Sequence, residues 1–193
     1  MKTAIIKYNA GNIQSVAFAL ERLGQQPVIT DDAKEIESAD KVIFPGVGEA
    51  SSAMRFLQEK KLDVLIKNLE QPVLGICLGL QLMCSFSEEN STGCLNLFPA
   101  KVKRFDKALK TPHVGWNQIS DLKTSLFGGV KEGSYVYFVH SYFAEVNPHT
   151  IAETTYGNRF SAAIQFNNFI ATQFHPERSG KTGEQILKNF LAL

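Results

Sequence analysis

The chain has 193 residues, 44% hydrophobic and 20% charged, with a formal net charge of +1; this fits one domain, 1–193, whose core needs no metal or disulfide. The lack of a dense lysine and arginine block argues against nucleic acid or a membrane surface as partner. No apolar run approaches the roughly 20 residues needed to span a bilayer, and none forms a signal peptide, so we expect a cytoplasmic protein.

Short apolar runs alternate with helical patterns through the first half of the chain. Apolar residues recur at helical spacing over 13–23 and again over 50–69, which predicts one helix and then one or two more. A turn-forming segment, 9–12, ends the first apolar run. The runs predict strands at Thr3–Tyr8, Pro27–Thr30, Lys41–Phe44 and Pro72–Ile76. Such alternation is typical of a parallel sheet covered on both faces by helices.

The second half of the chain is richer in runs of period two. The predicted strands are Lys101–Phe105, Ser134–Val139, Ile151–Tyr156, Ser161–Phe166 and Phe169–Phe174. Turn signals at 157–158 and 167–168 predict hairpins between neighbouring strands. A last helix is expected from Gly180 onward. Together these patterns predict one α/β domain with added antiparallel strands.

A possible nucleophile lies in the segment Gly75-Ile76-Cys77-Leu78-Gly79-Leu80-Gln81. It follows a predicted buried strand and begins a helical pattern, the setting of a nucleophile elbow. The helix N-terminus would favour a thiolate at Cys77 and leave N–H groups, such as that of Leu78, for an oxyanion. The alternative is that Cys77 is only a small buried residue at a strand end. We expect that role for Cys84 and Cys94.

A cysteine nucleophile needs a base, and the base needs an orienting group. His175 lies just beyond a predicted strand in Thr172-Gln173-Phe174-His175-Pro176-Glu177. Open α/β sheets place their sites at such carboxyl ends of strands. Glu177 is close enough in sequence to orient the imidazole towards Cys77. On its own, the His-Pro-Glu segment could equally be a surface loop.

The elbow and the Phe-His-Pro-Glu segment together resemble the class I, triad-type glutamine amidotransferases. The resemblance spans essentially the whole chain and implies a flavodoxin-like fold, with a central, mostly parallel sheet, helices on both faces and added antiparallel strands. It also implies that Cys77 is the nucleophile, that His175 is the base and acid, and that Glu177 orients the histidine. Such enzymes release ammonia from glutamine through a glutamyl thioester.

Other segments resemble one family within that class, the glutaminase subunits of imidazole glycerol phosphate synthases in histidine biosynthesis. These segments are Tyr8–Asn12 with Ser15, Pro45–Gly48, Pro112–Asn117 and Tyr137–Tyr142. The resemblance implies a heterodimer with a (β/α)8-barrel cyclase subunit, to which ammonia passes through the interface. It implies glutamine as the small-molecule substrate, with no cofactor and no metal.

The resemblance also assigns roles around the triad. Pro45–Gly48 would be an oxyanion strand, whose glycines permit a peptide flip and which can stay non-productive until the partner's ligand binds. The backbone groups of Val47, Gly48 and Leu78 would form the oxyanion hole. Glutamine would be bound by Gly46, Gln81, Ser141 and Tyr142. The alternatives are an ordinary turn at 45–48 and a solvated Gln81.

Three residues match positions that face the synthase partner or transmit its ligand state: Asn12, Trp116 and Arg178. Relatives often have lysine where this chain has Arg178, so the charge is kept but the contact geometry differs. Core packing is the alternative for Trp116. No role is assigned to His113, His140 or His149.

Two rival functions remain at this point. One is a glutaminase subunit of another class I amidotransferase, such as those serving anthranilate or pyridoxal phosphate synthesis. The other is a non-catalytic regulatory subunit that keeps the fold. The Tyr8–Asn12 and Pro112–Asn117 segments argue against the first, and the intact triad argues against the second.

Overall fold

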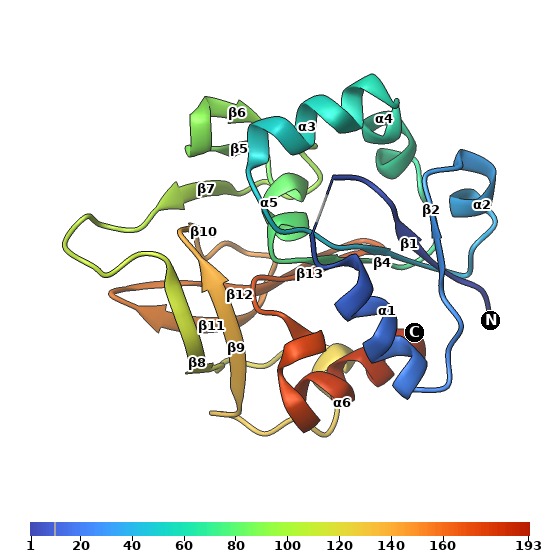
Figure 1. Ribbon diagram of the computed structural model, residues 1–193. Helices are drawn as coiled ribbons and strands as arrows, with labels where there is room; N and C mark the ends of the chain where they lie inside the picture. The colour runs from blue at the N-terminus through green and yellow to red at the C-terminus, as the bar shows by residue number, and fades with distance from the viewer. Residues whose placement is uncertain (10) are drawn as a thin grey trace.

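A seven-stranded sheet runs through the centre of the molecule (Figure 1). The computed structural model describes residues 1–9 and 11–193; Ala10, in the turn predicted at 9–12, lies outside the described residues. The strand order is β11-β12-β13-β4-β3-β1-β2. Five strands are parallel: β1 (Thr3–Ile6), β2 (Val28–Thr30), β3 (Lys41–Phe44), β4 (Val73–Ile76) and β13 (Phe169–Thr172). The order of these five is the flavodoxin-like one, so the predicted fold class is confirmed.

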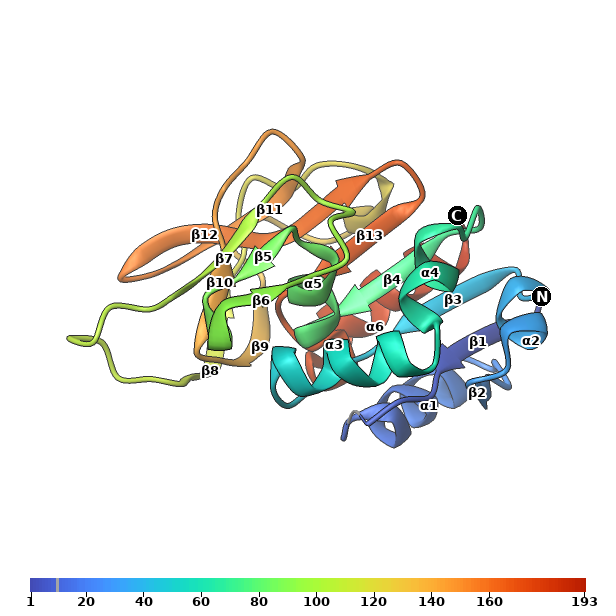
Figure 2. The ribbon, with the colours of Figure 1, turned by 90° about the horizontal axis from the view of Figure 1, so that it is seen from above.

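Antiparallel strands extend this sheet at one edge. They are β12 (Asn158–Phe166) and β11 (Thr150–Tyr156), joined to each other and to β13 by hairpins. Figure 2 shows the succession from β2 at one side of the molecule to β11 at the other. The predicted hairpins at 157–158 and 167–168 are therefore present. The last predicted strand also has a second neighbour, because β13 pairs in parallel with β4.

Helices cover both faces of the sheet because its central strands are apolar on both sides. In β1, Ala4 and Ile6 join one core cluster and Ile5 joins the other. The first cluster includes residues of α2 (Ala33–Glu37), α3 (Ala50–Glu59), α4 (Leu62–Lys67) and α5 (Leu78–Met83). The second includes residues of α1 (Ile13–Arg22) and α6 (Gly180–Leu191). The expected helical region 50–69 is thus two helices, separated at Lys61, whose φ is 57°.

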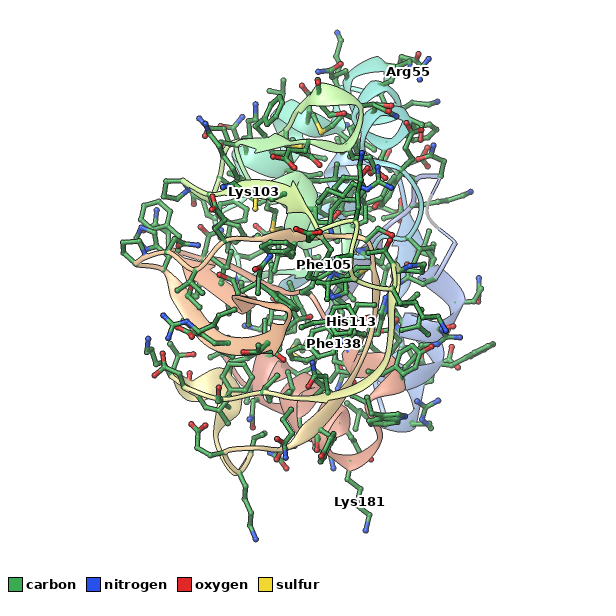
Figure 3. The ribbon with its side chains drawn as sticks, turned by 90° about the vertical axis from the view of Figure 1, so that its left-hand side faces the viewer. Arg55, Lys103, Phe105, His113, Phe138 and Lys181 are labelled. Atoms are coloured by element: carbon green, nitrogen blue, oxygen red, sulfur yellow. The ribbon has the colours of Figure 1, made fainter. Side chains whose placement is uncertain are left out.

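Two smaller sheets lie beside the carboxyl ends of the parallel strands. One contains β10 (Tyr142–Ala144), β7 (Lys101–Arg104), β5 (Phe86–Ser87) and β6 (Thr92–Gly93); the other pairs β8 (His113–Gln118) with β9 (Tyr135–His140). Short 3-10 helices occur at η1 (Glu89–Ser91), η2 (Ser125–Phe127) and η3 (Pro176–Arg178). The inner side of the β8–β9 pair packs through aromatic rings, and Figure 3 shows Phe105, His113 and Phe138 together in the interior.

The prediction missed several short elements, among them α2 and β8. β8 has no simple period-two pattern, because Gly115 interrupts it and Trp116 on its outer side is exposed. Pairing with β9 over six residues defines it instead. None of the helices in the described ranges is long and apolar enough to cross a membrane.

Candidate active site

Cys77 lies at a sharp turn between β4 and α5, where the elbow motif places it. Its backbone has φ 54° and ψ −105°, a conformation that costs a side-chain-bearing residue on the order of 1–3 kcal/mol. Gly79 allows the close packing behind the turn, since a Cβ atom there would clash with the carbonyl oxygen of Phe44. The elbow therefore holds the Cys77 sulfur at the carboxyl end of the parallel sheet, where α5 begins.

His175 and Glu177 follow β13, the strand beside β4. His175 Nδ1 lies 2.8 Å from Glu177 Oε1, and both side chains are almost fully buried. Asn12 Nδ2 donates to the same carboxylate oxygen at 3.2 Å. Because Glu177 accepts the Nδ1 proton, Nε2 of His175 is the nitrogen that can exchange a proton with Cys77. Nε2 has no hydrogen-bond partner within the described part of the chain.

The pKa of His175 is raised although its side chain is buried. Burial lowers its pKa, but the negative charge of Cys77 and the hydrogen bond to Glu177 outweigh burial and raise the pKa to about 10. The imidazole of this Cys77–His175 pair is therefore protonated at neutral pH. Tyr8 stays neutral beside this pair, because burial and the charge of Cys77 raise the pKa of its hydroxyl well above the usual range.

A cavity of about 250 Å³ adjoins the Cys77 sulfur. A space of this size suits a small metabolite rather than a large cofactor. Its wall contains six of the residues predicted for the oxyanion hole and for glutamine: Val47, Gly48, Leu78, Gln81, Ser141 and Tyr142. Gln81 is only 4% exposed, which excludes the solvated alternative. Gly46, also predicted to bind glutamine, does not line the cavity in this conformation.

The segment 45–48 occupies the predicted oxyanion hole in a closed form. The backbone N–H of Leu78 donates to the carbonyl oxygen of Gly46 at 3.2 Å, so a carbonyl lies where an oxyanion would need a donor. Tyr8 fixes the preceding peptide, because its hydroxyl donates to the Pro45 carbonyl at 2.5 Å. A Cβ atom on Gly46 would lie 2.6 Å from that hydroxyl oxygen, which explains the need for glycine there.

The three residues predicted to face the partner differ in position. Asn12 is 8% exposed, and its side chain donates a hydrogen bond to Glu177. Trp116 is 55% exposed, which excludes core packing, and it meets the ring of Tyr137 edge-on. The guanidinium of Arg178 lies over the same Tyr137 ring, with 5.5 Å from Cζ to the ring centroid.

Three features of the site were not predicted. Glu89 contributes a half-buried carboxylate to the cavity wall. Gln173 is fully buried and points its amide at the Cys77 sulfur. His113 and His140, which the prediction left without a role, hydrogen-bond to each other at 3.1 Å. For Gln173, the available signal was a polar side chain inside the apolar run 169–174. Glu89 lies in a short 3-10 helix, and its sequence pattern gives no signal of a binding role.

Comparison with known proteins identifies the family. Residues 4–193 match the family described as glutamine amidotransferase class-I. This chain therefore belongs to the class I glutamine amidotransferase family. Similar curated proteins carry the name imidazole glycerol phosphate synthase subunit HisH: one from Bacteroides fragilis (strain YCH46) is 58% identical over the full length of both chains, and one from Haemophilus influenzae (strain Rd) is 51% identical over 97% of this chain and 95% of its own.

Solved structures show the same fold at much lower identity. A putative GMP synthase protein from Thermoplasma acidophilum aligns with a TM-score of 0.76 at 20% identity, covering 100% of this chain and 92% of its own. PurLQS from Thermotoga maritima aligns with a TM-score of 0.75 at 15% identity, covering 99% and 97%. These likenesses bear on the fold alone.

Proposed function

We propose that this chain is the glutaminase subunit of an imidazole glycerol phosphate synthase, acting in cytoplasmic histidine biosynthesis. The observation that carries the proposal is the His175–Glu177 pair next to Cys77, which itself lines a small cavity, in a chain whose full-length relatives bear that name. The same names favour it over a glutaminase serving anthranilate or pyridoxal phosphate synthesis. The complete triad favours it over a non-catalytic subunit.

The geometry supports hydrolysis in two steps. The Cys77 sulfur attacks the carboxamide carbon of glutamine, and the C–N bond breaks as His175 gives its Nε2 proton to the departing ammonia. This leaves a glutamyl thioester. His175 then takes a proton from water, which attacks the thioester carbon and releases glutamate and the Cys77 thiolate. Glu177 keeps the imidazole oriented and stabilises its positive charge.

The cavity wall offers complementary groups for the amino-acid end of glutamine. Glu89 has a carboxylate on this wall, and burial raises the pKa of that carboxylate. The Ala50 N–H, which donates a hydrogen bond to Oε2 at 2.7 Å, lowers the pKa but by less than burial raises it. We assign Glu89 to the α-ammonium group of glutamine, which would offset that burial. Ser141 and Tyr142 also line the cavity, and we assign their backbone groups to the same end of glutamine.

The closed oxyanion strand supports a gated enzyme. With the Gly46 carbonyl on the Leu78 N–H, the tetrahedral intermediate would lose one donor and meet a repelling oxygen. One missing donor costs about 10²–10³ in rate. Rotation of the 46–47 peptide would withdraw this carbonyl and present the Val47 N–H instead. We infer that the partner's ligand favours this rotation.

The outer side of the β8–β9 pair supports the partner assignment. Cross-strand pairing places Val114, Trp116, Tyr135 and Tyr137 on that side, and the first three are each more than half exposed. The side continues along β9 to Val139, whose carbonyl oxygen lies 3.7 Å from the Cys77 sulfur. A barrel subunit docked here would cover the reacting sulfur and receive ammonia directly.

The test is reconstitution with a cyclase subunit. Cys77→Ala should abolish glutamine-driven synthesis, because no thioester can form, while synthesis driven by ammonium salts persists. Cys94→Ala, which removes a cysteine outside the cavity wall, is the matched control and should keep both activities. Glutamine-driven turnover by Cys77→Ala would refute the nucleophile assignment, and failure of any cyclase subunit to bind would refute the partner.

A further inference from the structure

We propose that Gln173 is a further catalytic residue, whose side-chain N–H group donates a hydrogen bond to the Cys77 sulfur and favours its thiolate form. Gln173 lies between β13 and η3 and is 0% exposed. Its Nε2 atom is 3.7 Å from Cys77 Sγ, a distance suited to a hydrogen bond to the larger sulfur atom. The proposal rests on the glutaminase function above and concerns how its nucleophile is prepared.

Neighbouring groups determine which end of the Gln173 amide faces the sulfur. The carbonyl oxygen of Tyr142 can only accept, so the Gln81 atom 2.9 Å from it must be the NH₂ group. The same NH₂ group lies 3.1 Å from the Gln173 amide, whose nearer atom must therefore be its oxygen. The NH₂ group of Gln173 is then left to face Cys77. The Tyr142 carbonyl thus fixes the orientation of the Gln81 amide, which in turn fixes that of the Gln173 amide.

The Tyr142 carbonyl is held from a second direction by a pair of histidines. His140 Nδ1 lies 2.7 Å from it and must carry a proton, so His140 Nε2 accepts from His113 Nδ1 at 3.1 Å. Burial lowers the pKa of His113 to about 4 and that of His140 to about 3. Both rings therefore stay neutral at physiological pH, and the carbonyl keeps its direction.

The charged and titratable groups near the sulfur explain why a neutral donor is useful there. His175 carries a positive charge that it must give up when it protonates ammonia, and the Tyr8 hydroxyl donates its hydrogen bond to Pro45. Gln173 neither titrates nor moves its proton, so its N–H group remains at the sulfur through both steps. In a buried site a hydrogen bond to a charged atom is stronger than one between neutral groups.

The alternative is that Gln173 only fills space and satisfies Gln81. Alkylation of Cys77 by iodoacetamide in the isolated chain separates the two roles, because the thiolate is the reacting species. Gln173→Met keeps the length of the side chain and removes the donor. We expect the pH midpoint of Cys77 alkylation to rise by about one pH unit relative to the unmodified chain, which corresponds to a tenfold change in the thiol–thiolate equilibrium, with the two rates converging at alkaline pH. Gln58→Met, exposed on α3, should alkylate like the unmodified chain.

The midpoint is compared on folded protein only, because an unfolded chain exposes Cys77 and alkylates it with the ordinary pKa of a free thiol. Should Gln173→Met unfold, Gln81→Met provides the second variant: it leaves the donor but frees the amide to turn, so a smaller shift in the same direction is expected. An unchanged midpoint, even with equal slowing at every pH, would overturn the role of Gln173. Normal alkylation without glutaminase activity in the unmodified chain with partner would instead refute the proposed function.

Discussion

At the level of single residues, two buried polar atoms of the triad have no hydrogen-bond partner among the described residues: His175 Nε2 and Glu177 Oε2. An unpaired buried group costs about 1–3 kcal/mol. The proposed mechanism accounts for Nε2, because it requires this nitrogen to take and give a proton beside Cys77. The site thus leaves a nitrogen unpaired where the reaction needs one.

The triad roles predict a ranking of variants. Glu177→Gln should reduce glutamate release less than His175→Ala, because glutamine can still hydrogen-bond to Nδ1 although it stabilises the imidazolium poorly. Steady-state rates of the complex provide the measurement. If Glu177→Gln proved as damaging as His175→Ala, the orienting role would be wrong.

The substrate assignment predicts a change in KM rather than in turnover. Glu89→Gln should raise KM for glutamine at least tenfold with a smaller effect on kcat, since the α-ammonium lies away from the reacting carbon. Glu88→Gln alters the exposed neighbour, whose carboxylate accepts from the Arg104 N–H, and should leave KM alone. An unchanged KM in Glu89→Gln would remove Glu89 from the substrate site.

At the level of elements, the closed oxyanion strand is held by a hydrogen bond from Tyr8, in the segment that follows β1. Tyr8→Phe removes the hydrogen bond to Pro45 and should loosen the closed orientation by about 1 kcal/mol. We therefore expect glutamate release by the isolated chain to rise roughly fivefold. Tyr135→Phe, on the exposed side of β9, serves as the control. A fall in release, or no change, would show that the Tyr8–Pro45 hydrogen bond does not favour the closed strand.

The histidine pair behind the β8–β9 hairpin predicts how stability depends on pH. The pKa values of His113 and His140 are lowered in the folded chain, to about 4 and about 3, from an unfolded value of 6.5. Both states are neutral above pH 6.5, so this contribution is complete there. As the pH falls below 6.5 the unfolded chain takes up protons first, and stability is lost by about 1.4 kcal/mol per pH unit for each such proton.

Chemical denaturation between pH 6.5 and 5 measures this dependence. A His113→Gln and His140→Gln double variant should show a shallower loss of unfolding free energy than the unmodified chain. His149→Gln, outside the pair, should follow the unmodified chain. Equal slopes in the double variant and the unmodified chain would contradict neutral burial of the pair.

At the level of the whole molecule, sequence patterns predicted the parallel half better than the additions to it. The strands at 41–44 and 73–76 are apolar on both sides, and their buried runs define them without reference to partners. β8 depends on pairing with β9, so its own residues carry a weak signal. For the site, Cys77 and His175 belong to short motifs, whereas Gln173 gains its meaning only from Gln81 and Tyr142, distant in the sequence.

We propose that this chain is a glutaminase whose oxyanion strand stays closed until the partner subunit binds its ligand. Coupling between two sites is commonly worth 1–3 kcal/mol, and a larger effect requires a strongly biased resting state. We infer that the hydrogen bond from the Leu78 N–H to the Gly46 carbonyl provides such a bias, since it occupies a donor that the proposed oxyanion hole requires. Glutamine would then be spared when the barrel holds no acceptor.

The most direct test is to measure glutamate release by the chain alone, by its complex with the cyclase subunit, and by the complex with a ribonucleotide analogue bound. We expect a poor rate for the chain alone and a rate higher by at least about 10²-fold for the liganded complex, the range that one oxyanion donor supplies. Equal turnover in all three states would contradict the gate and leave a constitutively active glutaminase.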